Sequence, residues 1–354
     1  MDLNEIMRQF RTEVDASAYG NGHINDTYYV KNSEYILQKI NTKIFLNPDE
    51  LMDNIVNVTE FLREKIKAAG GNPDRETLTV IKTVDGKNFY RDSDGSCYRA
   101  YVFIKDTVTI ENDKTVEDMY NAGKGFGKFM GMLSDFPVGK LYETIVDFHH
   151  TPKRVDALKK AIAEDKAGRA ASVAPEIEFA LKNAEFAHVV VDGLADGSIP
   201  LRVTHNDTKI NNILFDDKTK EAIAVIDLDT VMPGSMLYDF GDALRIGAST
   251  GAEDETDLSK VNFDLEIFKR FTEGYLETGG DTLVEREIEL LAFSAKLLTY
   301  ECGIRFLTDY LNGDTYFKIH HEHHNLDRAR NQFKLVEDMT AKESQMKEIV
   351  NNAR

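Results

Sequence analysis

The chain has 354 residues, a formal net charge of −18 and two cysteines. This length suffices for one large domain or for two lobes with a sizeable core. The acidic balance argues against a surface that holds nucleic acid or anionic lipid, although it is compatible with a local basic pocket for a small phosphate.

Neither a signal peptide nor a membrane-spanning segment is expected. The first residues, MDLNEIMRQF, contain no basic stretch followed by an apolar core. No apolar run approaches the roughly 20 residues that a membrane helix needs. Cys97 and Cys302 are too few for a disulfide framework and suit a reducing compartment. We therefore expect a cytoplasmic protein with no membrane and no nucleic-acid partner.

Short β-rich runs dominate the chain before residue 105. Gly and Asp turns such as VDGK and SDGS separate several of them, which is typical of antiparallel hairpins. The predicted strands cover residues 27–30, 35–40, 77–84, 87–91 and 97–104.

One helix interrupts this series. Asn47 is a good N-cap, Pro48 suits the first helical position, and the acids at 49 and 50 suit the positive end of the helix dipole. The sequence AAGG then predicts where the helix stops. The apolar residues that follow the cap recur at helical spacing and are Leu51, Ile55, Val58, Leu62 and Ile66.

After residue 115 the pattern is mostly helical, with strand signals confined to about residues 200–230. The two patterns predict an α+β chain of two regions. Residues 1–105 form a small antiparallel sheet with one helix, and residues 106–354 form a larger, mainly helical part.

A polar segment, RVTHNDTKINNILFDD, stands out at residues 202–217. The stretch that follows it, ending in VIDLDT, reads as two short strands around a polar turn, a hairpin that would bring Asn212 and Asp227 close together. Two oxygen ligands at the base of a hairpin suit Mg²⁺ that holds nucleotide phosphates. The carboxylate of Asp207 is suited to accept a proton from an attacking hydroxyl. This combination predicts phosphoryl transfer.

The segments HNDTKINNIL and VIDLDT resemble the catalytic and metal-binding segments of the aminoglycoside phosphotransferase and choline kinase superfamily, whose members are relatives of protein kinases. The resemblance implies a two-lobed protein-kinase-like fold, with residues 1–105 as the nucleotide-binding lobe and 106–354 as the catalytic lobe. It also implies ATP as co-substrate and Mg²⁺ as cofactor.

The same resemblance implies roles for individual residues. Asp207 matches the catalytic base, and His205 matches the residue that braces the catalytic loop. Asn212 and Asp227 match the metal ligands, while Asp229 falls where many relatives carry an acid that assists the metal or the loop.

Five blocks are similar, more narrowly, to the N-acetylhexosamine 1-kinases of that superfamily. This similarity implies transfer of phosphate to the anomeric hydroxyl of N-acetylglucosamine or N-acetylgalactosamine, a small amino sugar. The blocks are YGNGHINDTYYV, YILQKINTKIF, LRVTHNDTKINNILFDD, IDLDTVMPGSMLYDFGDALRIGAST and ECGIRFLTDYL.

Residues for the sugar come from the helical segment ECGIRFLTDYLNGDTYF. Arg305 and Asp309 are four residues apart and share a helix face, so they form either a salt bridge or a sugar clamp. The resemblance favours Arg305 as a substrate contact, with Tyr316 beside it. Lys209 is a candidate for neutralising charge on the transferred phosphoryl group.

Residues for the nucleotide come from two N-terminal blocks. Gly20 and Gly22 lie in a turn where backbone could approach phosphates, although two glycines beside Asn often mark only a hairpin turn. In the same block, His23 and Asn25 are the polar side chains best placed to meet phosphate or sugar.

The third predicted strand departs from the kinase pattern. That strand usually carries a Lys or Arg that pairs with phosphate and with a helix acid. Here Gln38 occupies the aligned position and Lys39 is its neighbour, so their side chains point to opposite faces and either could do this work. We favour Gln38 as the inward residue. Glu50 and Glu60 are both candidate helix partners.

The cluster HHEHHN at residues 320–325 does not match the spacing of helical zinc motifs, and exposed or interface histidines are the simpler interpretation.

Two alternative functions stay open. One is a kinase of the same fold that acts on choline, ethanolamine, homoserine or an aminoglycoside, which Arg305 disfavours. The other is a non-catalytic binding module, which the joint presence of the catalytic and metal residues disfavours. The sequence predicts no oligomeric state.

Overall fold

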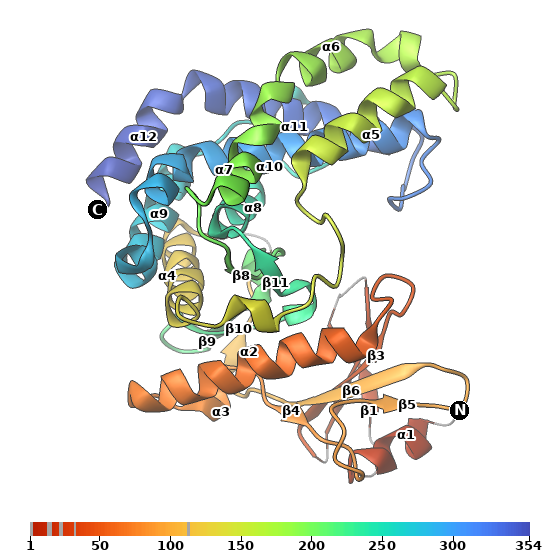
Figure 1. The fold of residues 1–354 in the computed structure, drawn as a ribbon, viewed down its shortest axis with the longest axis vertical. Helices are drawn as coiled ribbons and strands as arrows, with labels where there is room; N and C mark the ends of the chain where they lie inside the picture. The colour runs from red at the N-terminus through yellow and green to blue at the C-terminus, as the bar shows by residue number, and fades with distance from the viewer. Residues whose placement is uncertain (1–2, 13–15, 21–23, 32, 112–113) are drawn as a thin grey trace. The chain divides into compact units, whose positions relative to one another are not determined.

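The computed structural model describes residues 3–12, 16–20, 24–31, 33–111 and 114–354 (Figure 1). The chain forms two compact units, each assembled from three stretches. The first comprises Met1–Thr109, Met132–Val146 and Asn212–Pro233, and the second comprises Ile110–Gly131, Asp147–Asn211 and Gly234–Arg354. The units therefore do not follow a single break at residue 105.

The first unit contains an antiparallel sheet in the order β1-β2-β3-β6-β4, with β5 paired to β6. The predicted strands are all present, but the predicted runs 77–84 and 87–91 are each reduced to two residues, and the three-residue β1 was not predicted. The strands are β1 (Ala16–Ala18), β2 (Asp26–Val30), β3 (Tyr35–Ile40), β4 (Val80–Ile81), β5 (Tyr90–Arg91) and β6 (Cys97–Val102).

The predicted helix of this unit is confirmed as α2, Pro48–Ala68. The Asn47 side chain accepts a hydrogen bond from the backbone N–H of Glu50 at 3.4 Å, as its N-cap position requires. All five apolar residues predicted for its inner face are buried. Two short helices, α1 (Leu3–Gln9) and α3 (Pro73–Glu76), were not predicted.

The predicted hairpin is also confirmed. It consists of β9 (Ile213–Asp216) and β10 (Ala222–Val225), which pair antiparallel with Ile213 opposite Val225. A third strand that was not predicted, β7 (Thr107–Val108), pairs with β9. This pairing is one reason why residues from the later part of the chain belong to the first unit.

The second unit is mainly helical, with the 27-residue α10 at its centre. Helix α8 approaches α10 so closely that a Cβ on Gly241 would lie 2.4 Å from the backbone oxygen of Ser294, which explains a glycine there. The helices are α4 (Val116–Met132), α5 (Thr151–Glu164), α6 (Ala174–Lys182), α7 (His188–Asp196), α8 (Met236–Gly247), α9 (Leu265–Gly279), α10 (Glu285–Leu311), α11 (His324–Ala341) and α12 (Glu343–Asn352).

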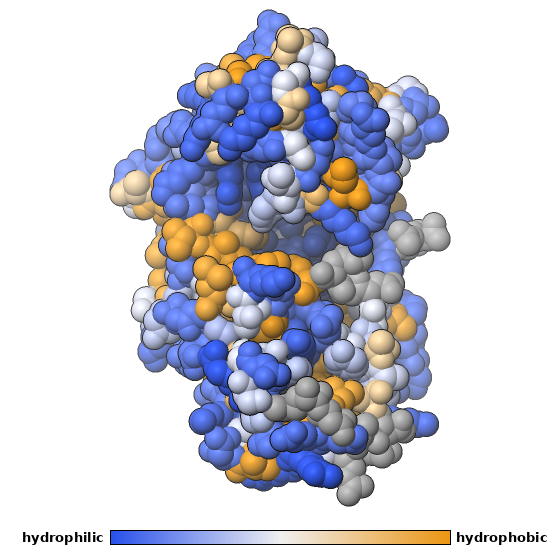
Figure 2. Space-filling model, turned by 90° about the vertical axis from the view of Figure 1, so that its right-hand side faces the viewer, coloured by the Kyte–Doolittle hydropathy of each residue, from blue (hydrophilic) through white to orange (hydrophobic). Residues whose placement is uncertain are grey.

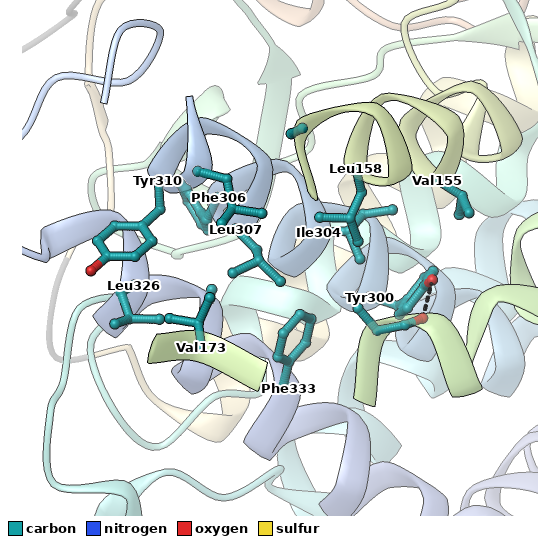
Figure 3. Packing of buried hydrophobic residues seen from close by; sticks show 14 of the residues in the cluster. Val155, Leu158, Val173, Tyr300, Ile304, Phe306, Leu307, Tyr310, Leu326 and Phe333 are labelled. Carbon is teal, nitrogen blue, oxygen red and sulfur yellow. Dashed lines mark hydrogen bonds between the residues drawn. The ribbon is translucent and has the colours of Figure 1, made fainter. Parts of the chain in front are cut away.

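One hydrophobic cluster of this unit joins α5, α10 and α11 (Figure 3). Val155 and Leu158 of α5 belong to the same cluster as Ile304 and Leu307 of α10. The hydroxyl of Tyr300, buried in this cluster, donates a hydrogen bond to the Ala180 carbonyl at 2.7 Å. Close packing of this kind restricts the movement of α5 and α10, and so of the polar residues next to Val155 and Ile304 in the sequence.

The surface agrees with the composition. Figure 2 shows that the face it draws is largely hydrophilic. None of the helices in the described part of the chain is long and apolar enough to cross a lipid bilayer.

Candidate active site

In the second unit, a short loop after β8 (Arg202–Thr204) carries three of the predicted catalytic residues. Lys209 Nζ lies 2.8 Å from Asp207 Oδ1, so the predicted base forms an ion pair with the predicted phosphoryl-binding cation. The fully buried His205 accepts a hydrogen bond at Nδ1 from the backbone N–H of Asp207 at 3.2 Å. His205 thereby orients the backbone of the Asp207 position.

Asp239 of α8 binds the backbone of this loop, a role that the sequence analysis did not predict. Its two carboxylate oxygens accept hydrogen bonds from the backbone N–H groups of His205 at 2.8 Å and Asn206 at 2.7 Å. Asn206 has a φ of 65°, a conformation that needs such support. Burial raises the pKa of Asp239, against the opposing attraction of His205. The sequence signal was an acid between apolar and aromatic residues, in MLYDFG.

The charge of Lys209 is maintained by its neighbours. Burial acts to lower the pKa of Lys209, but the attraction and hydrogen bond of Asp207 outweigh it, with a smaller contribution from Asp242, and the pKa is raised. Asp242 also accepts a hydrogen bond from the backbone N–H of Thr208 at 3.2 Å. Lys209 is therefore a cation at neutral pH.

In the first unit, the hairpin places the two predicted metal ligands near each other. The backbone carbonyl of Asn212 accepts a hydrogen bond from the N–H of Ile226 at 2.9 Å, immediately before Asp227. Asp227 itself adopts a left-handed conformation, with φ 60° and ψ 55°. One amide and one carboxylate oxygen donor suit Mg²⁺, which takes a few hard ligands from protein and the rest from phosphate and water. The residues present therefore fit that ion.

Asp229 does not fit the metal role that the resemblance implies. Its Oδ1 lies 2.5 Å from Nη2 of Arg99, and its Oδ2 accepts a hydrogen bond from Asn25 Nδ2 at 2.7 Å. Arg99 is 1% exposed and Asp229 is 5% exposed, so this is a buried ion pair. Because both carboxylate oxygens are engaged by protein, Asp229 is better described as the partner of Arg99 than as a metal ligand.

Gln38 and Lys39 have different neighbours in the sheet, and Arg99 on β6 is the neighbour of Gln38. Gln38 lies directly opposite Arg99 in the sheet, and its Oε1 accepts hydrogen bonds from Arg99 Nε at 3.0 Å and Nη2 at 2.9 Å. Lys39 instead lies over the Tyr98 ring, 5.9 Å from its centroid. The buried cation is thus on the strand next to the expected one. Its acidic partner is Asp229 and not a residue of α2, so Glu50 and Glu60 do not have that role.

The ionisation of Arg99 follows from this pairing. Burial alone would lower the pKa of Arg99, but the attraction of Asp229 and a hydrogen bond to it raise the pKa, with Asp227 contributing. Sequence reasoning missed Arg99, although a charged residue in the apolar run CYRAYV was a signal of a buried pair.

The Gly-rich block is described only in part. Gly20 has a φ of 73°, which glycine adopts without strain, and a Cβ there would have no atom within 4 Å. Gly22 and His23 lie outside the described residues. Asn25 accepts a hydrogen bond from the backbone N–H of Asn41 at 3.0 Å while it donates to Asp229, so it links the start of the sheet to the buried ion pair.

The predicted sugar-binding residues of the second unit are arranged differently from expectation. Among the described residues no ion pair joins Arg305 to Asp309, whose two carboxylate oxygens are engaged by the following turn instead, so the predicted salt bridge between them is wrong. Asp309 accepts hydrogen bonds from the backbone N–H groups of Thr315 at 2.9 Å, Tyr316 at 2.8 Å and Phe317 at 2.9 Å. It organises the turn after α10 because a carboxylate satisfies several N–H groups at once.

Arg305 lies on α10, and Tyr316 lies in the turn that follows this helix. The Arg305 guanidinium lies 5.6 Å from the centroid of the Phe317 ring. Tyr316 is 74% exposed. Their roles in substrate binding stay predictions.

The histidine cluster contains one buried member. His324 is fully buried, accepts a hydrogen bond from the backbone N–H of His320 at Nδ1 and contacts Asp254 through Nε2 at 3.1 Å. Burial lowers the pKa of His324. His320, His321 and His323 are exposed. Among the residues that the structure describes, no three His, Cys, Asp or Glu side chains gather in a way that could hold a metal ion.

Comparisons with known proteins agree with this geometry. In fold, the chain is similar to a microcompartment-associated aminopropanol kinase (TM-score 0.64, 16% identity, 97% of each chain covered). It is similar to an aminoglycoside phosphotransferase from Alicyclobacillus acidocaldarius subsp. acidocaldarius DSM 446 (TM-score 0.65, 10% identity, 99% of this chain and 97% of that chain). It is also similar to the amicoumacin kinase hAmiN in complex with AMP-PNP, Ca²⁺ and Ami (TM-score 0.56, 12% identity, 91% of this chain and 88% of that chain).

These likenesses confirm the predicted fold class, a protein-kinase-like fold with an antiparallel sheet and a larger helical part. The sequence model of the phosphotransferase enzyme family, APH, matches residues 15–273, which is more than half of the chain. The match includes the catalytic loop, the hairpin and the Arg99–Asp229 pair. This chain belongs to the phosphotransferase enzyme family.

Proposed function

We propose that this protein is a Mg²⁺-dependent kinase that transfers the γ-phosphate of ATP to the anomeric hydroxyl of N-acetylglucosamine or N-acetylgalactosamine. The observation that carries the proposal is the catalytic loop, in which a carboxylate, Asp207, is held by His205 and Asp239 and paired with Lys209. A carboxylate on a rigid loop beside a cation suits proton removal from a hydroxyl that attacks a phosphoryl group.

Each residue has a distinct task. Asp207 accepts the proton of the sugar hydroxyl, and Lys209 stabilises the negative charge of the phosphoryl group in transfer. Asn212 and Asp227 would hold Mg²⁺, which when bound neutralises charge on the nucleotide phosphates. Arg99 keeps Asp229 and Gln38 in place next to the hairpin. ATP as the donor is supported by AMP-PNP in the structure of hAmiN.

The choice of an uncharged sugar rests on two supports. The first is the similarity of five sequence blocks to the N-acetylhexosamine 1-kinases. The second is a pair of arginines, because Arg305 lies within electrostatic range of Arg154 and acts to lower its pKa. An acceptor that carries ammonium groups would be repelled by this pair, whereas hydroxyl and amide oxygens would accept hydrogen bonds from it.

A second candidate is a kinase of the same fold that acts on an amino alcohol or an aminoglycoside. Its support is the net charge of −18 and the likeness in fold to an aminopropanol kinase. That charge is spread over the whole chain, so we regard it as weaker than the local charge around Arg305.

Phosphorus NMR of the product decides between these acceptors. The purified protein is incubated with ATP and Mg²⁺ and with N-acetylglucosamine, N-acetylgalactosamine, aminopropanol, choline or an aminoglycoside in parallel, and the Asp207→Asn variant sets the background. We expect a sugar 1-phosphate from both N-acetylhexosamines. A sugar 6-phosphate, or fast phosphorylation of a cationic acceptor with no sugar product, would reject the proposed acceptor and leave the family assignment intact.

A further inference from the structure

A buried carboxylate–histidine pair lies in the second unit, outside the residues used above. His149 Nδ1 lies 2.8 Å from Oε1 of Glu301, and Thr151 donates its hydroxyl hydrogen to Oε2 of Glu301 at 2.6 Å. The His149 side chain is 7% exposed and that of Glu301 is 2% exposed. The three side chains join the start of α5 to the middle of α10.

The pair determines which nitrogen of His149 carries hydrogen. Burial acts to raise the pKa of Glu301, but the attraction of His149 and a hydrogen bond to it, together with Arg305 and Thr151, lower the pKa overall. Glu301 is therefore an ionised carboxylate at neutral pH and can only accept hydrogen bonds. Nδ1 must donate to it, so that in the neutral form of the ring Nε2 carries the lone pair.

Nε2 of His149 is buried and has no hydrogen-bond partner among the described residues. The same holds for Nε of Arg154, one turn along α5. The Nη2 group of Arg154 donates to the carbonyls of Asp147 at 3.1 Å and Phe148 at 2.8 Å, immediately before His149. One short segment thus contains a hydrogen-bond acceptor and a hydrogen-bond donor that the protein leaves unsatisfied, which is costly unless another molecule meets them.

The segment lies beside the support of the catalytic loop. The His149 ring is 5.0 Å from the ring of Tyr238, centroid to centroid. The next residue, Asp239, holds the backbone of the loop that bears Asp207, and it also lies within electrostatic range of His149. One turn of α8 therefore contacts both the histidine and the catalytic loop.

We propose that His149, oriented by Glu301, is a substrate-contacting residue that accepts a hydrogen bond at Nε2 from a ring hydroxyl of the phosphate acceptor. Arg154 Nε donates to an oxygen of the same molecule. This inference rests on the proposed function and deepens it, because it assigns the class of acceptor. An uncharged polyhydroxyl molecule offers both the O–H donor and the oxygen acceptor that these two atoms require, and it is not repelled by Arg154 and Arg305.

The His149→Asn variant isolates the role of Nε2. An asparagine amide reaches about as far as Nδ1 of histidine, so it keeps the N–H that Glu301 accepts and lacks any atom at the Nε2 position. We expect kcat/KM for the sugar to fall about 5- to 100-fold, mainly through KM, while KM for ATP stays unchanged. The His149→Gln variant, whose amide oxygen reaches the Nε2 position, is the rescue: it can still accept from the sugar hydroxyl and should keep most of the sugar affinity.

Monodeoxy sugars distinguish a direct contact between His149 and the sugar from a purely structural role of His149. Wild-type kinetics are measured with the 3-, 4- and 6-deoxy analogues of N-acetylglucosamine, and the measurements are repeated with His149→Asn. We expect kcat/KM of the wild-type protein to fall with one analogue by about as much as His149→Asn lowers kcat/KM for N-acetylglucosamine. With that same analogue, His149→Asn should show no further fall in kcat/KM. A histidine that only supports the fold would add the same loss to every analogue.

His188 provides the matched control. It lies on α7, its side chain is 62% exposed, and it makes an i,i+4 pair with Asp192. His188→Asn should leave both KM values at the wild-type level. Wild-type KM for the sugar in His149→Asn, a His149→Gln variant as impaired as His149→Asn, or additive losses with all three analogues, would overturn the proposal. Failure of the proposed function is a different result, since the wild-type protein would then form no sugar 1-phosphate at all.

Discussion

Two arginines, Arg99 in the first unit and Arg154 in the second, are held in opposite ways. Arg99 is paired with the carboxylate of Asp229 and the amide of Gln38, and its pKa is raised. Arg154 donates to backbone carbonyls, its Nε has no partner among the described residues, and its pKa is lowered by burial and by the repulsion of Arg305.

This difference in pairing indicates that the two arginines have different functions. A cation whose charge is matched inside the protein is suited to hold other residues in place. A cation that has no carboxylate ion pair and keeps an unsatisfied N–H is suited to meet a ligand. The first region should therefore act through positioning of the nucleotide and metal residues, and the second through contact with the acceptor. The experiments below test this contrast.

The largest effect is expected from the metal residues near Arg99. Asp227→Ala should abolish Mg²⁺-dependent transfer, because the nucleotide phosphates lose the carboxylate that holds their cation. Asn212→Ala should be milder, since it removes a neutral ligand and leaves the carboxylate. Product formation is measured over a range of Mg²⁺ concentrations. Wild-type activity in Asp227→Ala would mean that the metal binds elsewhere.

The next effect concerns the catalytic loop of the second unit. Asp207→Asn should lower kcat by about 10²- to 10⁴-fold, the usual contribution of a general base, with no change in thermal unfolding. Asp217→Asn, an exposed residue in the turn of the hairpin, is the control and should retain full activity. Near-normal turnover in Asp207→Asn would remove this residue from its proposed role.

The buried pair should dominate stability. Arg99→Met leaves Asp229 buried without its cation and should lower the free energy of unfolding by about 3–5 kcal/mol. Arg99→Met combined with Asp229→Asn should recover part of this loss, because the unpaired charge is then gone. By contrast, Arg154→Met should cost much less stability. Urea denaturation measures the free energy of unfolding of all three variants. Equal losses of stability in Arg99→Met and Arg154→Met would contradict the proposed difference between the two arginines.

The smallest effect is expected at Arg305. Arg305→Ala should raise KM for the sugar by about 5- to 100-fold, as expected when a buried polar contact is lost, and should change KM for ATP little. Arg286, an exposed residue at the other end of α10 that pairs with Glu289, is the matched control. A rise in KM for ATP alone would place Arg305 on the nucleotide side.

The sequence alone determined the local elements and the spacing of the catalytic residues. Helix α2 was predictable from its periodicity and cap, and the β9–β10 hairpin from its alternation and turn. These features depend only on residues that are neighbours along the chain. The order His205, Asp207, Asn212 and Asp227 likewise belongs to one continuous segment.

Only the tertiary structure decided which polar groups meet. Gln38 and Lys39 could not be separated until the sheet register placed Gln38 opposite Arg99. Asp309, predicted to bind sugar, instead satisfies the N–H groups of a turn. The bond between His149 and Glu301 spans 152 positions. Such pairs form because hydrophobic packing brings distant elements together and burial then makes each polar group require a partner, and no local pattern records that requirement.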